Sequence, residues 1–331
     1  MSTLRVLITG ATGFIGINLV NAIKKCMPAV EINVLIRNPN KSFMFNMLSN
    51  IKIRNADIMN KPLLDNYVNN IDIVFHLCGV LGKWGLSDQL YWDINVEGTR
   101  NLIKACLENG SVKHFVYLSS AGVLGSSINN ADESFALNPS NIYEKTKAEA
   151  ERIAMEYYNR QGFPVTILRP EFVYGPYDRH VLGLFKAIKH GLLFLVEDGI
   201  SVLHPTYIGD LTGILLGCIY KINTAGRVYI VAGERSLTVK EFVALIAKYL
   251  KVRAPFISVS RRSALLGAYA FESMARIFKI NPILTKSRVS LFTDSRSYNT
   301  AKAKRDLGFV PSSLEDSVRE TVNWYILNNY L

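Results

Sequence analysis

Tyr143 and Lys147 lie four residues apart in a segment with helical periodicity, so their side chains would stand one above the other on one helix face. A tyrosine hydroxyl titrates near about pH 10, and we expect the Lys147 ammonium to lower that pKa by favouring the phenolate. Ser120 follows a predicted strand and would donate a hydrogen bond to a substrate oxygen as negative charge develops there. Tyr143 could then transfer a proton while a hydride moves at the neighbouring carbon.

A tyrosine and a lysine at this spacing are usually ordinary surface residues, so the interpretation depends on what surrounds them. The stretch 4–16 (LRVLITGATGFIG) is an apolar strand, a turn and the start of an amphipathic helix. Gly10 would permit the turn, Gly13 would let the backbone approach a pyrophosphate, and Gly16 would let the helix pack against the strand. The free amides of the helix N-terminus would bind phosphate. A glycine-rich loop without a ligand is the alternative.

The end of the second predicted strand, 31–36, bears on which dinucleotide would bind. A carboxylate at this place binds the ribose 2′-hydroxyl of NAD, whereas a cation suits the 2′-phosphate of NADP. The chain has Arg37 there, with Lys41 close behind. The sequence therefore favours NADP over NAD, unless Arg37 is only a solvated turn residue.

The remaining pattern alternates strands with helices. We expect strands at 51–54, 71–76, 112–118 and 165–168, and long helices at 91–109 and 141–161. This order predicts an α/β fold with a doubly wound parallel sheet and a ligand at the carboxyl ends of the strands. We expect a dinucleotide-binding domain over 1–170, with later returns around 205–232, and a mainly substrate-binding region over 171–331 that ends in an amphipathic helix at 312–328.

Composition restricts the class of protein. The net charge of +11 is spread without a long basic block, which favours a generally basic enzyme surface over nucleic-acid binding. We find no signal-peptide pattern, and the uncharged run 6–23 is broken by glycines, unlike a membrane span. Four cysteines lack metal-ligand or disulfide spacing, so we expect no metal and a reducing, cytoplasmic setting. They are Cys26, Cys78, Cys106 and Cys218.

The motifs together, in this order and over nearly the full length, resemble the extended short-chain dehydrogenase/reductase superfamily. The resemblance implies a Rossmann fold, a bound NAD(P), a Ser-Tyr-Lys catalytic set and a homodimer through a four-helix interface. It also selects Ser120 over Ser119, because the family's serine stands five residues before the loop glycine, here Gly125. The segments that carry it are Thr9–Gly16, Asp57, His76–Gly79, Asn95, Ser119–Ser120, Tyr143–Lys147, Arg169–Pro170 and Val173–Pro176.

From the residues and the resemblance we expect two contact sets beside the catalytic Ser120, Tyr143 and Lys147. The predicted cofactor contacts are Gly10, Thr12, Gly13, Phe14, Ile15, Gly16, Arg37, Lys41, Asp57, Ile58, Leu77, Cys78, Gly79, Asn95, Leu118, Tyr143, Lys147, Pro170, Phe172 and Val173. The predicted substrate contacts are Lys83, Trp84, Ser120, Ala121, Gly122, Tyr143, Glu171, Tyr207 and Arg288.

Within the superfamily, two apolar substitutions argue against a nucleotide-sugar substrate. Members that act on such sugars commonly have an asparagine where this chain has Phe172 and an arginine where it has Leu203. Apolar residues there would leave diphosphate oxygens poorly paired, although Arg288 remains as a possible phosphate ligand. The segments 82–85, 204–207 and 264–278 are more similar to the 3β-hydroxysteroid dehydrogenase branch.

The stretch 261–279 combines several apolar residues and few charges with basic residues near its ends. It would cap an apolar substrate pocket or contact an anionic membrane surface. The alternative is a helix packed on its own domain.

We therefore predict an NAD(P)-dependent oxidoreductase that interconverts a secondary alcohol and a ketone on a largely apolar small molecule, sterol-like or a β-hydroxy acid. The first alternative is a nucleotide-sugar 4-epimerase or dehydratase with tightly bound NAD. The second is a cofactor-sensing protein without chemistry, against which the intact Ser120, Tyr143 and Lys147 argue.

Overall fold

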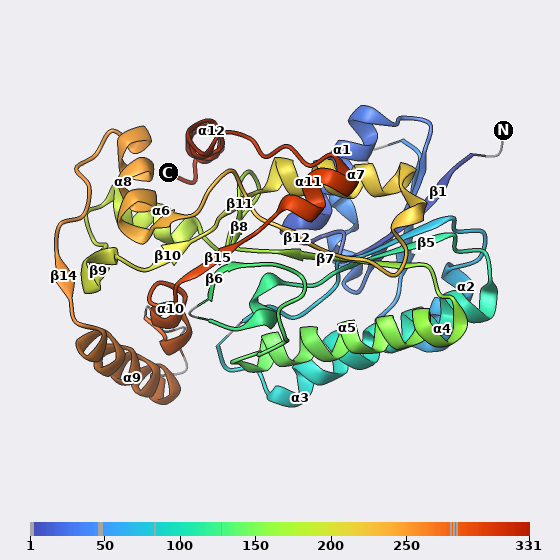
Figure 1. Ribbon diagram of the computed structural model, residues 1–331, viewed down its shortest axis with the longest axis horizontal. Coiled ribbons are helices and arrows are strands. Elements are labelled where there is room, and N and C mark those ends of the chain that lie inside the picture. The colour runs from blue at the N-terminus through green and yellow to red at the C-terminus, as the bar shows by residue number, and fades with distance from the viewer. Residues whose placement is uncertain are drawn as a thin grey trace.

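A seven-stranded parallel sheet organises the computed structural model (Figure 1), which describes residues 3–45, 49–82, 84–126, 128–278, 280, 282 and 284–331. The strand order is β12-β7-β5-β4-β1-β2-β3. The chain adds strands on one side of β1 up to β3 and then continues on the other side with β4, and a ligand crevice forms at such a switch point between β1 and β4. The predicted α/β doubly wound fold is confirmed. The strands are β1 (Arg5–Thr9), β2 (Glu31–Ile36), β3 (Ile51–Asn55), β4 (Ile73–His76), β5 (His114–Leu118), β7 (Val165–Pro170) and β12 (Val228–Val231).

Helices cover both faces of this sheet because its central strands are apolar on both sides (Figure 1). One face carries α1 (Phe14–Cys26) and α7 (Ile208–Tyr220), which pack against each other. The other face carries α2 (Lys61–Tyr67), α4 (Gly98–Asn109) and α5 (Ile142–Gln161). Each face has its own buried hydrophobic core.

The helix predicted at 91–109 is interrupted. It consists of α3 (Asp88–Tyr91), a π-helical segment η2 (Trp92–Glu97) and then α4. Such π-turns are rare and occur often at functional sites. Asn95 lies inside this segment, so the irregularity falls on a predicted site residue.

The remainder of the chain lies beyond the carboxyl ends of the sheet strands (Figure 1). The helices of this part are α6 (Leu182–Lys189), α8 (Val239–Leu250), α9 (Arg261–Phe278), α10 (Lys286–Leu291) and α12 (Leu314–Leu327). Elsewhere, α11 (Ala301–Leu307) lies beside β12, and η5 (Ile222–Thr224) lies near the start of β7. Further short helical turns are η1 (Pro39–Met44), η3 (Ala121–Leu124) and η4 (Glu197–Gly199). Four two-stranded pairs are β6 (Ile128–Ala131) with β15 (Arg296–Tyr298), β8 (Val173–Tyr174) with β11 (Thr206–Tyr207), β9 (Leu195–Val196) with β14 (Ser258–Val259), and β10 (Val202–Leu203) with β13 (Leu237–Thr238).

The later return of the chain to the sheet takes the form of β12, which pairs with β7. The domain boundary at residue 170 stays a prediction. Within the described part of the chain, no helix is both long and apolar enough to cross a membrane.

Candidate active site

The glycine turn after β1 brings three backbone segments into close contact. Gly10 has φ +70°, and a Cβ there would lie 2.8 Å from the backbone nitrogen of Cys78. A Cβ on Gly16 would overlap the Gly10 carbonyl oxygen, so α1 could not pack as it does. Both positions need glycine, Gly10 for its conformation as well as for space.

The N-terminus of α1 is open to an anion. Gly13 is its N-cap residue, and no side chain among the described residues caps the helix. The first turn, which includes Phe14 and Ile15, has no acidic residue to compete for its amides. Unpaired amides and the positive end of the helix dipole suit a pyrophosphate, so these residues fit a dinucleotide.

A buried histidine joins the strand ends beneath this turn. His76 Nδ1 lies 2.7 Å from Thr9 Oγ1, and His76 Nε2 lies 2.8 Å from Thr99 Oγ1. The Cys78 amide donates to Thr9 Oγ1 at 3.2 Å. Burial lowers the pKa of His76 to about 3, so its ring is neutral at physiological pH. The network links β1, β4 and α4, and the role of Thr99 was missed in the sequence because nothing marks it locally.

Asn95 fixes the loop after β4 to α5. Its Oδ1 accepts from the Val80 amide at 2.7 Å, and its Nδ2 donates to Thr146 Oγ1 at 2.9 Å. Thr146 Oγ1 in turn donates to the Tyr143 carbonyl at 2.9 Å. Asn95 was predicted to contact the cofactor, and its observed bonds are those of a residue that positions Gly79 and the helix of Tyr143.

Lys147 reaches the same place from α5. Its side chain is buried, and Nζ donates to the Leu118 carbonyl at 2.5 Å, 4.3 Å from the centre of the Tyr117 ring. Nζ also lies 3.8 Å from where a Gly79 Cβ would stand. Burial lowers the pKa of Lys147 to about 8, and the Glu151 carboxylate one turn later opposes that shift. Lys147 Nζ therefore lies between Leu118 at the end of β5 and Gly79 after β4, close to the glycine turn.

Glu151 is itself held by a buried arginine at the end of β7. Arg169 Nη2 donates to Glu151 Oε2 at 2.6 Å, and its Nε contacts the other carboxylate oxygen at 3.0 Å. Both side chains are nearly inaccessible. A buried bidentate pair of this kind fixes geometry, so it anchors α5 against the sheet.

The Ser120 hydroxyl lies near the Tyr143 phenol and affects its pKa. Burial raises the pKa of Tyr143, the Ser120 hydroxyl opposes the rise, and the Glu144 and Glu171 carboxylates add to it. The pKa of Tyr143 is thus raised and not lowered as expected, because the loss of hydration is the largest effect and the Lys147 ammonium is not among its causes. The phenol is protonated at neutral pH, which suits it to donate a proton to a carbonyl oxygen.

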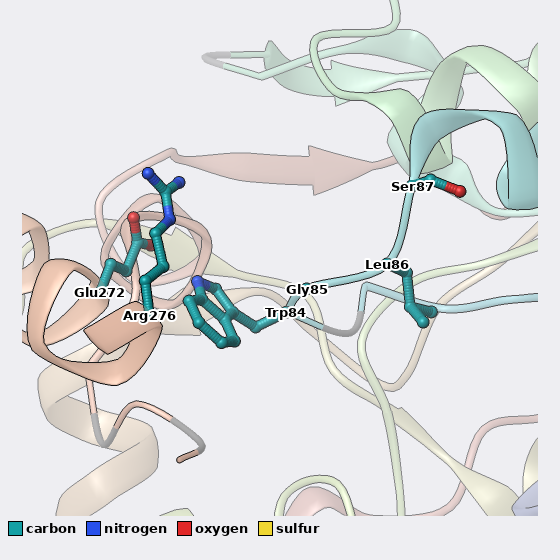
Figure 2. A pocket seen from close by; sticks show the side chains of 6 residues that line it. All are labelled: Trp84, Gly85, Leu86, Ser87, Glu272 and Arg276. Carbon is teal, nitrogen blue, oxygen red and sulfur yellow. The ribbon is translucent and has the colours of Figure 1, made fainter. Parts of the chain in front are cut away.

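Several predicted substrate residues adjoin this group. Ala121 and Gly122 are buried in η3, which Ser120 caps by accepting from the Gly122 amide at 3.2 Å. Glu171 is buried after β7. Trp84 lines a hollow of about 450 Å³ together with Glu272 and Arg276 of α9, and Figure 2 shows its indole beside these two side chains. Lys83 lies outside the described residues.

Other predicted contacts lie farther out. The Tyr207 ring is buried against Tyr174, and the nearby Glu320 of α12 raises the pKa of its hydroxyl, while Arg288 is exposed on α10. Phe172 has φ +30° and packs edge-on against Phe242 and Phe292, with ring centres 6.0 Å and 6.4 Å away. The structure thus assigns Tyr207 to the core, and the substrate roles of these residues stay predictions.

Two of the residues expected near the adenosine carry charges that reach Cys78. Arg37 lowers and Asp57 raises the pKa of the Cys78 thiol, so both charges lie near the glycine turn. Lys41 is exposed in η1, and Ile58 packs under Gly98 of α4. Thr12, Leu77, Pro170 and Val173 flank the same strand ends.

The family model described as 3-beta hydroxysteroid dehydrogenase/isomerase matches residues 7–250. The chain belongs to this family. It is an enzyme of the extended short-chain dehydrogenase/reductase type, as predicted.

Its relatives include both predicted reaction types. The chain is 29% identical to a sterol-4-alpha-carboxylate 3-dehydrogenase (decarboxylating) of Saccharomyces cerevisiae, over 96% of this chain and 97% of that protein. It is 26% identical to an N-acetyl-alpha-D-glucosaminyl-diphospho-ditrans,octacis-undecaprenol 4-epimerase of Escherichia coli O157:H7, over 96% and 94%. A UDP-glucuronic acid 4-epimerase from Bacillus cereus, solved with UDP-glucuronic acid and NAD, has the same fold, with TM-score 0.80, 22% identity and 98% and 100% coverage.

Proposed function

We propose that this protein is an NAD(P)-dependent dehydrogenase that interconverts a secondary alcohol and a ketone on a largely apolar, lipid-like molecule. One observation carries the proposal. Lys147 Nζ lies beside Gly79, and the preceding residue, Cys78, is in backbone contact with Gly10, so the catalytic set and the phosphate-binding turn share one crevice. A bound nicotinamide dinucleotide would supply or accept the hydride there.

Three side chains of the protein carry out the proton transfer and stabilise the charges. Tyr143 transfers the proton, and Ser120 hydrogen-bonds the reacting oxygen as charge develops on it. Lys147 holds a positive charge beside them and offers donors to ribose hydroxyls. Because the phenol is protonated at neutral pH, ketone reduction should proceed near neutrality, and alcohol oxidation should accelerate as pH rises and the phenolate forms.

An apolar substrate is supported by the cluster of Phe172, Phe242 and Phe292 at the loop after β7. Phe172 offers no polar partner to a diphosphate at the place where an asparagine would. Two of the relatives described above also act on lipids, a sterol carboxylate and an undecaprenol-linked sugar.

The test is turnover with lipid alcohols. Purified protein is supplied with NAD or NADP and a panel of 3β-hydroxysterols, sterol 4-carboxylates and β-hydroxy acids, and reduced cofactor is followed by its absorbance. Reduction of the cofactor by at least one lipid alcohol is expected, with none by the same alcohol in Tyr143→Phe. Failure with every lipid, together with turnover of a UDP-sugar, would reject the proposal.

A second candidate is 4-epimerisation of a sugar on a lipid diphosphate. The relative from Escherichia coli favours it, because it matches nearly the whole chain and its name describes such a substrate. The two functions differ in what leaves the site. A dehydrogenase releases reduced cofactor in proportion to product, whereas an epimerase returns the hydride and converts substrate without net reduction.

We propose NADP as the preferred cofactor, supported by the exposed cations Arg37 and Lys41 after β2. The solved relative quoted above holds NAD, so the two cofactors must be compared directly. Arg37→Asp should lower affinity for NADP far more than for NAD. An unchanged ratio of the two affinities would remove this preference.

We further propose that α9 contacts an anionic membrane surface, where a lipid substrate would be collected. Its exposed side includes Leu266, 72% accessible, and Ile277, 74% accessible, with Arg261, Arg262 and Arg276 on the same helix. Flotation with anionic vesicles should recover the protein, and zwitterionic vesicles should recover less. If the protein is recovered with neither kind of vesicle, this contact is rejected.

We propose a homodimer through α4 and α5, which lie side by side on one face of the sheet (Figure 1). Two copies of this pair would form a four-helix interface, and a monomer by sedimentation equilibrium would exclude it.

Four free cysteines support the expected reducing, cytoplasmic setting.

A further inference from the structure

The strand β15, from the C-terminal part of the chain, reaches the carboxylates that flank Tyr143. Arg296 Nη2 donates to Glu144 Oε1 at 2.9 Å, and the Tyr298 hydroxyl donates to Glu171 Oε2 at 3.2 Å. Glu144 follows Tyr143 in α5, and Glu171 follows β7. The charges around the catalytic phenol are therefore set partly by a strand that belongs to neither half of the Rossmann sheet.

The Arg296 guanidinium is fitted closely into this place. Its side chain is 14% exposed and that of Glu144 is 5% exposed. A Cβ on Gly122 would lie 3.0 Å from Arg296 Nη1 and 2.9 Å from Glu144 Oε1, so the ion pair occupies the space that a side chain two residues after Ser120 would fill. Ser140 fixes the other Glu144 oxygen through its amide at 2.8 Å and its hydroxyl at 2.7 Å.

The strand itself is anchored independently of this pair. The Tyr298 amide donates to His204 Nδ1 at 3.2 Å, and the Tyr298 ring stacks on the His204 ring, with centres 6.3 Å apart. β15 also pairs with β6, with a register shift between Arg296 and Tyr298. A substitution at Arg296 should therefore leave the strand in place.

Two carboxylates and one guanidinium face each other here. Glu144 and Glu171 both disfavour ionisation of Tyr143, and Arg296 lowers the pKa of Glu171 against the effect of burial. Without Arg296, two buried carboxylates would lack their cation. The titratable groups around Tyr143 are Glu144 and Lys147 on its own helix, Tyr117 on β5, Glu171 after β7, and Arg296 and Tyr298 on β15.

We propose that Arg296 is a positioning residue for catalysis, which pins Glu144 and keeps the Glu144–Glu171 pair compensated so that the Tyr143 proton can leave and return. The proposal rests on the proposed function in one respect, the role of Tyr143. Its electrostatic part concerns the protein alone and can be measured without a substrate.

The first measurement is the titration of Glu171 by carbon NMR in protein labelled at glutamate side-chain carboxyls, assigned with Glu171→Gln. We expect the titration midpoint to rise by about one pH unit or more in Arg296→Met. Arg296→Lys should bring the midpoint most of the way back to the wild-type value, because lysine supplies a positive charge again. An unchanged midpoint in Arg296→Met overturns the proposal even if no substrate is found.

The second measurement is the pH profile of alcohol oxidation. Uncompensated carboxylates disfavour the phenolate, so the alkaline rise in rate should move to higher pH in Arg296→Met, and Arg296→Lys should move it back. A rate that falls equally at every pH and is not restored by lysine would assign Arg296 a structural role only. A wild-type protein without oxidation of any alcohol would reject the proposed function and leave the glutamate titration to decide this inference.

Two controls guard against general damage. Arg227→Met removes the Arg227–Asp306 ion pair at 3.1 Å, outside the site, and should change neither the Glu171 titration nor the pH profile. Arg296→Gln serves if Arg296→Met fails to fold, because the amide can still hydrogen-bond to Glu144 without a charge. Thermal unfolding of each variant reports its folding.

Discussion

The glycine-turn half of the site and the half contributed by the C-terminal part are built on different principles. The first is made of adjoining strand ends in one parallel sheet, with Thr9, His76 and Lys147 locked by short hydrogen bonds. The second is made of segments outside that sheet: Trp84, which lines a hollow with α9, and Arg296 on β15. Proton and hydride transfer should depend on the first half together with Arg296, and choice of substrate on the region of Trp84 and α9.

Tyr143→Phe should have the largest effect, because it removes the proton donor while leaving the crevice intact. We expect turnover to fall by about 10²–10⁴-fold with little change in cofactor affinity. Steady-state rates and fluorescence titration with NADPH measure the two. Wild-type turnover in this variant would mean that another group moves the proton.

Gly10→Ala should come next, because the substitution adds a strained conformation and an overlap with the Cys78 backbone. We expect a loss of about 2–4 kcal/mol in the free energy of unfolding, measured in urea, together with loss of cofactor binding. Gly110→Ala is a matched control, with φ +73° and no atom close to its added Cβ. If both variants lose the same free energy, the close approach contributes nothing.

The two halves also differ in how far the sequence predicts them. The strand β2 was predicted at its observed limits, because a strand buried on both faces leaves a nearly continuous apolar run. Helix α5 was predicted from Asn141 onward, and Asn141 caps it by accepting from the Glu144 amide at 3.0 Å. Features of this kind depend on residues that are neighbours in the sequence, so the sequence predicts them.

The rest depends on contacts between distant residues. β6 and β15 are joined by bonds such as that from Ser297 to Asn129, 168 residues apart, and neither short strand has a recognisable pattern. Arg296 was missed for that reason. The pKa of Tyr143 was expected in the wrong direction because the spacing of Lys147 is visible in the sequence and the burial of the phenol is not.

The buried His76 gives the first half a pH dependence. Its pKa is lowered to about 3 from 6.5, so between these values the unfolded chain binds a proton that the folded chain does not. Stability should therefore fall as pH falls through this window, with a slope from this group of at most about 1.4 kcal/mol per pH unit. His76→Gln should be less stable at neutral pH and show a shallower acid slope in urea titrations. Equal slopes in the two proteins would show that other groups carry the acid sensitivity.

The smallest effect on stability should come from substitutions on the exposed face of α9. These variants test directly whether α9 binds a membrane or only packs on its own domain. Leu266→Gln and Ile277→Gln replace side chains that are largely in water, so each should change the free energy of unfolding by less than about 0.5 kcal/mol. The same variants should reduce recovery on anionic vesicles, because each removes apolar area from the membrane contact. Leu192→Gln, at a residue of equal exposure on another segment, is the control. A large loss of stability, or vesicle recovery like that of the control, would show that α9 serves its own domain and that substrate capture lies elsewhere.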